Sequence, residues 1–316
     1  MYYLGATHTK THCDRPILAE LREFRQRKTA STTAIEHIYG VLQWVAAVTP
    51  SGDTWLYFII EALRRARRTR GQLQLGERFM EDLDWWIERL SAAEGTRLER
   101  RIWFPEVAYI DITSDAATTI GQGGGAFVII DGSIHYFTVT WTETELKYVP
   151  PEYGTLDWKR RHGKEGPKPL FILRLEFFLM VLGVIVFWPL LKGRRVRLRL
   201  VGDNMGSVNI LNRGRSRRDP VVALMHRHLD LFCAKRAIEH EAAHLPGDLN
   251  ETADALSRMQ WRRFRELTKG LTRRRTQVPR SARALLLKAL VDSKVPLTRP
   301  ERNRRTGRAN VGSPSS

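Results

Sequence analysis

Apolar side chains recur every three or four residues through most of the first hundred positions, which is the period of amphipathic helices. The apolar stripes of the first two predicted helices contain Ile17, Leu18, Leu21, Phe24, Ile35, Ile38, Val41, Leu42 and Val45. After a turn at residues 49–53, another helix begins near Trp55, and a further one carries Phe79, Leu83, Trp86 and Leu90. This pattern predicts a small helical unit over residues 1–100.

Beyond residue 102 the period changes to two, which is typical of strands. Strand candidates cover residues 107–115, 126–130 and 133–141, and a glycine-rich stretch at 121–125 is predicted to form the first turn between them. Because the connections are short, we expect an antiparallel meander. Residues 142–170 are rich in proline and glycine, and we expect a long loop there.

An apolar segment follows that loop. Residues 177–191 (FFLMVLGVIVFWPLL) carry no charge over fifteen positions. This length falls short of the roughly 18–20 residues that cross a bilayer, and Pro189 interrupts it. We therefore expect a helix buried inside the protein and no membrane partner.

The remaining elements complete a mixed pattern. Residues 194–203 (RRVRLRLVGD) alternate basic and apolar side chains and end at Asp203, which predicts a strand with one polar face. Helices are expected near 207–211 and 221–236, then a short strand at 238–242 and a last helix within 244–258. The order βββ-α-β-α-β-α predicts an α/β fold, of the α+β mixed-sheet kind, over residues 101–259.

Charge is concentrated at the end of the chain. The net charge is +18, and residues 260–316 carry 16 Lys or Arg against three acids, a net of +13, which leaves +5 for residues 1–259. A basic protein favours a polyanionic partner such as nucleic acid. Residues 260–316 are predicted to be a disordered basic tail, which could be a solvated end, a nucleic-acid arm or a nuclear-targeting patch.

Cysteine usage and the N-terminus bear on location. Cys13 and Cys233 have no metal-like spacing, so neither a disulfide framework nor a zinc site is indicated. The first residues lack the basic-then-apolar layout of a secretory signal. We expect an intracellular protein, cytoplasmic or nuclear.

Four carboxylates occupy informative positions. Asp115 and Asp203 end predicted strands, Glu176 lies early in the apolar helix, and Asp254 lies in the last helix. Each has a structural explanation when taken alone, and for Glu176 this is an interaction with the helix dipole. Together they indicate one rim of a sheet, where an acidic cluster needs a compensating cation and magnesium is the usual partner of all-oxygen sites.

These residues lie in motifs that resemble the ribonuclease H domain of a retroelement reverse transcriptase, of the DIRS-like or gypsy-like kind. The motifs are TSDAA at 113–117, RLEF at 174–177, VGDN at 201–204 and HLPGDLNETADALSR at 244–258. Stretches at 3–5, 38–52 and 82–86 are similar to the thumb and connection region of the same enzymes. The resemblance implies a ribonuclease H-like fold preceded by a thumb- or connection-like helical unit.

The resemblance also implies an activity, which is cleavage of the RNA strand of an RNA–DNA hybrid with two Mg²⁺ or Mn²⁺ ions. The implied metal ligands are Asp115, Glu176, Asp203 and Asp254. His244 is implied to assist proton movement or product release. The expected contacts with nucleic acid are Asn204, Gly123, Gly124 and Asn250.

The closing motif also makes a local prediction. Asp248 and Glu251 have the spacing of a capping box, which predicts that the last helix starts near Leu249. Asn250 and Asp254 are then four residues apart on one helical face.

Several alternatives remain open at this stage. Asp111 shares the strand face of Asp115, so periodicity does not separate the two as first ligand. A polymerase palm is absent, so we expect no polymerase activity from this chain alone, and a palm-bearing chain is a candidate partner. The competing functions are an inactive nucleic-acid-binding relic of a transposon and a transposase or integrase. The last is disfavoured because its acids usually run Asp, Asp, Glu.

Overall fold

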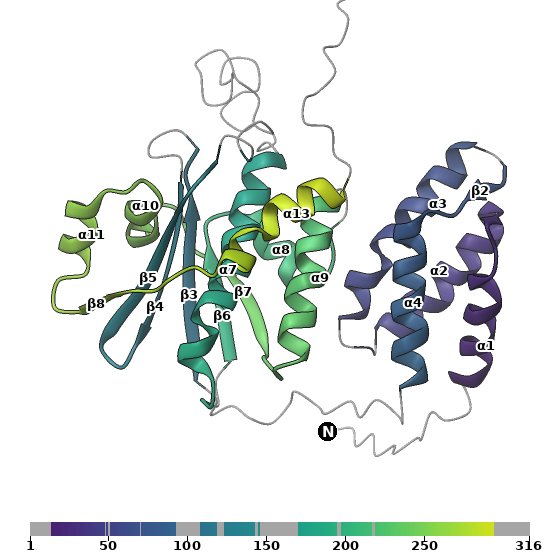
Figure 1. The fold of residues 1–316 in the computed structure, drawn as a ribbon, viewed down its shortest axis with the longest axis horizontal. Coiled ribbons are helices and arrows are strands. Elements are labelled where there is room, and N and C mark those ends of the chain that lie inside the picture. The colour runs from purple at the N-terminus through teal and green to yellow at the C-terminus, as the bar shows by residue number, and fades with distance from the viewer. Residues whose placement is uncertain are drawn as a thin grey trace, which may run out of the picture.

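The computed structural model describes residues 14–47, 49, 51–69, 71–92, 108–118, 123–142, 145, 170–194, 197–216 and 219–293. Residues 143–144 and 146–169 of the predicted loop, the motif at 3–5 and residues 294–316 of the predicted tail lie outside these ranges. In Figure 1 a helical unit lies beside a domain built on a sheet.

The helical unit contains α1 (Asp14–Arg25), α2 (Thr32–Ala46), the short 3-10 helix η1 (Gly52–Leu56), α3 (Tyr57–Thr69) and α4 (Glu77–Ser91). Two very short strands, β1 (Thr29–Ala30) and β2 (Leu73–Gln74), pair antiparallel between them. The helices lie where the apolar stripes predict them. Their stripes meet in one core, in which Leu21, Ile35, Leu42 and Trp86 are essentially inaccessible to solvent.

The second domain is built on a mixed sheet that has six strands in the described part of the chain. The strands are β3 (Tyr109–Ala116), β4 (Gly123–Ile130), β5 (Ser133–Thr140), β6 (Arg197–Gly202), β7 (His240–His244) and β8 (Thr272–Arg275). Their order is β7-β6-β3-β4-β5-β8. β3, β4 and β5 form the predicted antiparallel meander, whereas β6, β7 and β8 join it in parallel.

Helices cover both faces of this sheet. They are α7 (Leu170–Leu191), α8 (Met205–Arg213), α9 (Pro220–Ala234), α10 (Glu251–Ser257), α11 (Trp261–Leu267), α12 (Arg280–Arg283) and α13 (Leu285–Asp292). In Figure 1 α10 and α11 lie on one side of the strands, and α7, α8, α9 and α13 lie on the other. The order from β3 to α10 contains the predicted βββ-α-β-α-β-α series, so the mixed α/β, ribonuclease H-like fold is confirmed.

α7 is the apolar helix, and its stretch Ile172–Leu191 is long and apolar enough to cross a membrane by length and composition. Within the protein, 72% of its most apolar window is buried, because it packs against β3, β4 and α9. Glycines allow this close approach. A Cβ at Gly183 would lie 2.7 Å from Ile112 Cγ2, and one at Gly124 would lie 2.5 Å from Leu179 Cδ1. The predicted buried helix is confirmed.

The glycine-rich stretch differs from its prediction as a turn. Gly123, Gly124 and Gly125 are buried residues of β4. A Cβ at Gly125 would lie only 2.5 Å from Leu256 Cβ on α10. The glycines therefore bring helices close to both faces of the strand, and the predicted turn is wrong for these three residues.

The predicted disordered tail is wrong for residues 260–293, which form α11, β8, α12 and α13. Although this segment is rich in arginine, it also supplies Phe264, Ala282, Leu286 and Leu290 to the cores at 5% exposure or less. β8 pairs with β5 at the edge of the sheet. Composition averaged over the tail concealed these few well-spaced apolar residues.

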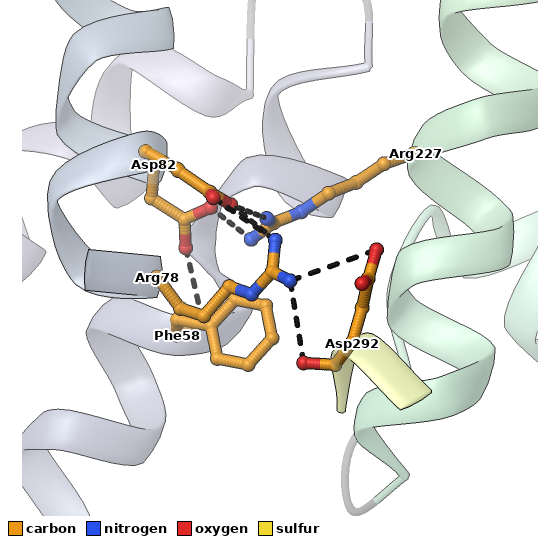
Figure 2. Close-up of polar contacts among 6 residues, drawn as sticks. Phe58, Arg78, Asp82, Arg227 and Asp292 are labelled. Atoms are coloured by element: carbon orange, nitrogen blue, oxygen red, sulfur yellow. Dashed lines mark hydrogen bonds and ion pairs between the residues drawn. The ribbon is translucent and has the colours of Figure 1, made fainter. Parts of the chain in front are cut away.

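The two units are joined by a buried polar junction, shown in Figure 2. Arg227 of α9 forms an ion pair with Asp82 of α4, and the main-chain N–H of Phe58 donates to the same carboxylate at 2.9 Å. Beside it, Arg78 Nη2 donates to the main-chain oxygen of Asp292 at 3.2 Å. These contacts fix α4 against α9 and the end of α13.

Candidate metal centre

Three of the predicted ligands meet at one point. Asp115, Glu176 and Asp203 each offer one carboxylate oxygen, and these oxygens all lie within 4.8 Å of one another. Asp115 is near the end of β3, and Asp203 directly follows β6. Because β3 and β6 are parallel neighbours, their carboxyl ends reach the same edge of the sheet. Glu176 enters the same place from α7.

Burial makes this cluster electrostatically costly. Asp115 and Glu176 are 6% and 2% exposed. Burial raises the pKa of Asp115 to about 6; the hydrogen bond from Ser257 opposes that shift, and the charges of Asp203 and Asp254 add to it. Buried carboxylates at this spacing need positive charge to remain ionised together. An all-oxygen donor set of this kind fits a hard divalent cation such as Mg²⁺ or Mn²⁺.

Neighbouring groups hold the carboxylates in place. The main-chain N–H of Ala116 donates to Glu176 Oε1 at 3.2 Å, and Ser257 Oγ donates to Asp115 Oδ2 at 2.5 Å. Ser257 was not predicted as a site residue, because only the packing of α10 on β4 brings it to Asp115. The turn after β7 also lies against the cluster, since a Cβ at Gly247 would be 3.4 Å from Asp203 Oδ2.

Asp254, the fourth predicted ligand, lies beside the cluster but is not a member of it. Its charge contributes to the raised pKa of Asp115. Its carboxylate, however, accepts from Arg258 Nε at 2.6 Å and lies 3.5 Å from Arg263 Nη1. Two guanidinium groups thus neutralise Asp254 where the sequence predicted a metal ion, and they were not recognised as its partners.

His244 is the last residue of β7 and is exposed. It pairs in register with Gly202, so it lies next to the end of β6. Its Nε2 is 3.1 Å from the main-chain oxygen of Asp203. The structure therefore places this histidine beside the main chain of Asp203, exposed to solvent.

The local prediction for the last helix is wrong at its start. α10 begins at Glu251 with Asn250 as its N-cap residue, and that residue makes no side-chain capping bond. The main-chain N–H groups of Leu249 and Asn250 bond to the oxygen of Pro246, so a turn occupies residues 247–249 before the helix begins. Asp248 therefore lies in that turn and does not cap the helix.

The predicted nucleic-acid contacts have structural positions instead. Asn204 is 4% exposed, and its Oδ1 accepts from the main-chain N–H groups of Gly206 and Ser207, which caps α8. Asn250 is 2% exposed and donates through Nδ2 to the main-chain oxygen of Ser114 at 3.3 Å. Gly123 and Gly124 are buried beneath side chains of α7 and the α10 region. None of these four offers much surface to a ligand in this conformation.

The ambiguity between Asp111 and Asp115 is resolved by their partners. Asp111 receives two hydrogen bonds from Arg199 on β6, Nε to Oδ1 at 2.7 Å and Nη2 to Oδ2 at 2.6 Å. Its side chain is 43% exposed, whereas Asp115 is buried in the cluster. Asp115 is therefore the candidate ligand.

Comparisons with known proteins add little to this geometry. No family model and no curated protein matches the chain. Among solved structures, the chain is similar to ribonuclease H1 from the halophilic archaeon Halobacterium salinarum NRC-1, with 13% identity and a TM-score of 0.31. The match covers 48% of this chain and 98% of that one. The assignment of a ribonuclease H-like domain with a candidate metal centre rests on strand order, helix positions and the acidic cluster.

Proposed function

We propose that this chain is a metal-dependent endonuclease that cleaves the RNA strand of RNA–DNA hybrids. The observation that supports this most directly is the acidic cluster, in which Asp115, Glu176 and Asp203 bring carboxylate oxygens within 4.8 Å of one another from three separate parts of the chain. A structural role alone does not require three acids at one edge of a sheet, two of them buried.

Asp115, Glu176 and Asp203 would hold Mg²⁺ or Mn²⁺, and Asp254 would complete a two-ion site on release from Arg258 and Arg263. When bound, such ions activate water and stabilise the leaving oxygen in phosphodiester hydrolysis. The chain itself orients the ligands through the donors that contact Asp115 and Glu176. His244, exposed beside Asp203, is placed to exchange a proton with solvent during product release.

The wider context is also a proposal. The net charge of +18 favours a polyanionic substrate. The motifs resemble a retrotransposon reverse transcriptase, so we propose that the chain is part or a fragment of one. The helical unit would then correspond to the thumb and connection, and a palm-bearing polymerase chain would be its partner. The expected setting is the cytoplasm or nucleus.

An inactive, nucleic-acid-binding relic is the second candidate, and one observation favours it. Asp254 is neutralised by two arginines, which reduces its availability to a metal ion. In that case the acidic cluster would remain as a structural feature while cleavage is lost.

A cleavage assay separates the candidates. The full chain is incubated with Mg²⁺ and an end-labelled RNA–DNA hybrid, with double-stranded DNA as the substrate control. We expect cleavage of the RNA strand alone, and we expect Asp203→Asn to reduce its rate on the order of a hundredfold or more through weaker metal binding. Asp111→Asn is the matched control. Asp111 lies on β3, the strand next to β6, but it pairs with Arg199 outside the cluster.

The outcomes are distinct. Retained activity in Asp203→Asn would contradict the assignment of the site. A folded wild-type chain that binds the hybrid without cutting it would favour the relic.

A further inference from the structure

The segment after α10 carries a dense positive charge in a defined place. Residues 260–275, named here the α11–β8 segment, contain seven Lys or Arg and one acid, a net of +6. The segment runs from the end of α10 through α11 to the outer strand β8. In Figure 1 it lies on the same side of the sheet as α10.

Part of this charge has a structural explanation. Arg273 donates to the main-chain oxygens of Arg265 at 2.8 Å and Thr268 at 3.2 Å, which closes the end of α11. Arginines on an outer strand also prevent unwanted edge pairing, which accounts for the rest of β8.

Three basic residues on and after α11 are not explained in this way. Arg262, Arg265 and Lys269 are exposed. The side chain of Arg262 is 91% exposed, and its ion pair with Glu266 is also exposed, so that pair contributes little to stability.

An exposed aromatic side chain lies among these basic residues. Trp261 is 37% exposed. Its ring packs against those of Tyr136 and Phe264, with ring centroids 6.4 Å and 6.5 Å away. An exposed tryptophan that packs against other rings is a surface on which a nucleobase or sugar can stack.

Trp261 and Arg262 also line an open hollow of about 630 Å³, together with Gln260, Arg263 and Glu266. Arg263 connects this hollow to the candidate metal centre, because its Nη2 is 3.0 Å from Glu251 and its Nη1 is 3.5 Å from Asp254. The hollow is therefore linked through Arg263 to Asp254, the acid that lies beside the cluster.

We infer that the α11–β8 segment is a nucleic-acid-binding surface that receives the substrate backbone next to the site of cleavage. Arg262, Arg265 and Lys269 contact phosphates, and Trp261 stacks on a base or sugar. Basic side chains interleaved with an aromatic ring are typical of such surfaces. This inference rests on the proposed function for its substrate.

The test measures binding of a fluorescently labelled RNA–DNA hybrid to the full chain by anisotropy, without divalent metal, over about 50 to 200 mM salt. The variant combines Arg262→Gln, Arg265→Gln and Lys269→Gln. We expect its log–log salt slope to fall by about two to three and its affinity to fall on the order of tenfold or more. The control combines Arg65→Gln, Arg67→Gln and Arg68→Gln, which removes equal charge from exposed positions of α3.

A second variant, Trp261→Leu, isolates stacking. We expect its affinity to fall on the order of fivefold or more with an unchanged salt slope. Unchanged binding in the α11 variant, or equal losses in the α11 and α3 variants, would overturn the inference. Because binding is measured without metal, failure of cleavage leaves this result intact, and active cleavage does not substitute for it.

Discussion

Replacement of Arg227 tests how the helical unit is joined to the ribonuclease H-like domain. Arg227 is 4% exposed and its partner Asp82 is fully buried. The guanidinium also lies 4.6 Å from the ring centroid of Trp55 and 4.5 Å from that of Phe58. Burial raises the pKa of Asp82 to about 7, against the opposing attraction of Arg227.

Arg227→Met keeps most of the side-chain volume but leaves the Asp82 carboxylate buried without a cation. Loss of the guanidinium removes the charge that lowers the pKa of Asp82, so that pKa rises further and the carboxyl becomes harder to ionise. At pH 8, where the wild type keeps an ionised pair, this loss costs up to about 3–5 kcal/mol. A carboxyl group whose folded pKa is raised stabilises the fold at low pH and loses that contribution as pH rises through the folded pKa. At pH 5 Asp82 is neutral in the folded protein, so the variant should lose only about 1–2 kcal/mol of hydrogen bonding and packing.

Substitution of the partner residue, Asp82, provides a second comparison. Asp82→Asn removes the titrating carboxyl and leaves a buried guanidinium that keeps its proton throughout. Because the wild type loses the contribution of Asp82 as pH rises through about 7, the cost of Asp82→Asn relative to the wild type should be smaller at pH 8 than at pH 5. The double variant removes both charges and should recover most of the stability lost in the single variants.

Urea unfolding of the four proteins, at pH 5 and pH 8, measures these differences. An equal loss of stability for Arg227→Met at both pH values would refute the reasoning. So would a double variant no more stable than Arg227→Met at pH 8.

Three further predictions concern the ribonuclease H-like domain. Ser257→Ala removes the donor to Asp115 and should weaken Mn²⁺ binding about 10- to 100-fold in calorimetry; unchanged affinity would contradict its positioning role. Gly125→Ala inserts a Cβ 2.5 Å from a side-chain atom of α10 and should cost about 1–3 kcal/mol in thermal unfolding. The control is Gly76→Ala in the helical unit, where nothing lies within 4 Å of the added Cβ; its cost should stay within about 0.5 kcal/mol. Burial lowers the pKa of His226 to about 4, so its contribution is present above its unfolded pKa of 6.5 and is lost as pH falls towards 4. The free energy of unfolding of His226→Gln should therefore fall by up to about 3 kcal/mol less than that of the wild type as pH decreases from 6.5 to 4. An equal fall in the two proteins would contradict this.

The types and order of most elements before residue 260 could be predicted from the sequence. The apolar stripe through Leu21 and Ile35, and the alternation from β3 to β5, are local patterns that survive in the folded protein. The positions of the acids at the ends of β3 and β6 could likewise be predicted, because neighbouring residues indicate where a strand ends. Their meeting could be expected only once the two strands were taken to be parallel neighbours.

Composition was a poorer guide than periodicity. Residues 260–293 were predicted to be disordered because arginine dominates their average. A few apolar side chains such as Phe264 and Leu286 are enough to fix them when a core is available to receive them. The glycines of β4 were misread for a related reason, since a sequence does not show whether a missing Cβ permits a turn or a closely packed helix.

The sequence by itself determined most of the secondary structure before residue 260, the mixed fold and the candidate acids, because these depend mainly on residues close together along the chain. Only the tertiary structure decided which charges face one another. Asp111 meets Arg199, Asp254 meets Arg258 and Arg263, and Asp115 meets Glu176 and Asp203. A carboxylate has the same charge in every case. Whether it meets a guanidinium or another carboxylate depends on strand register and helix packing between residues that are mostly far apart in sequence.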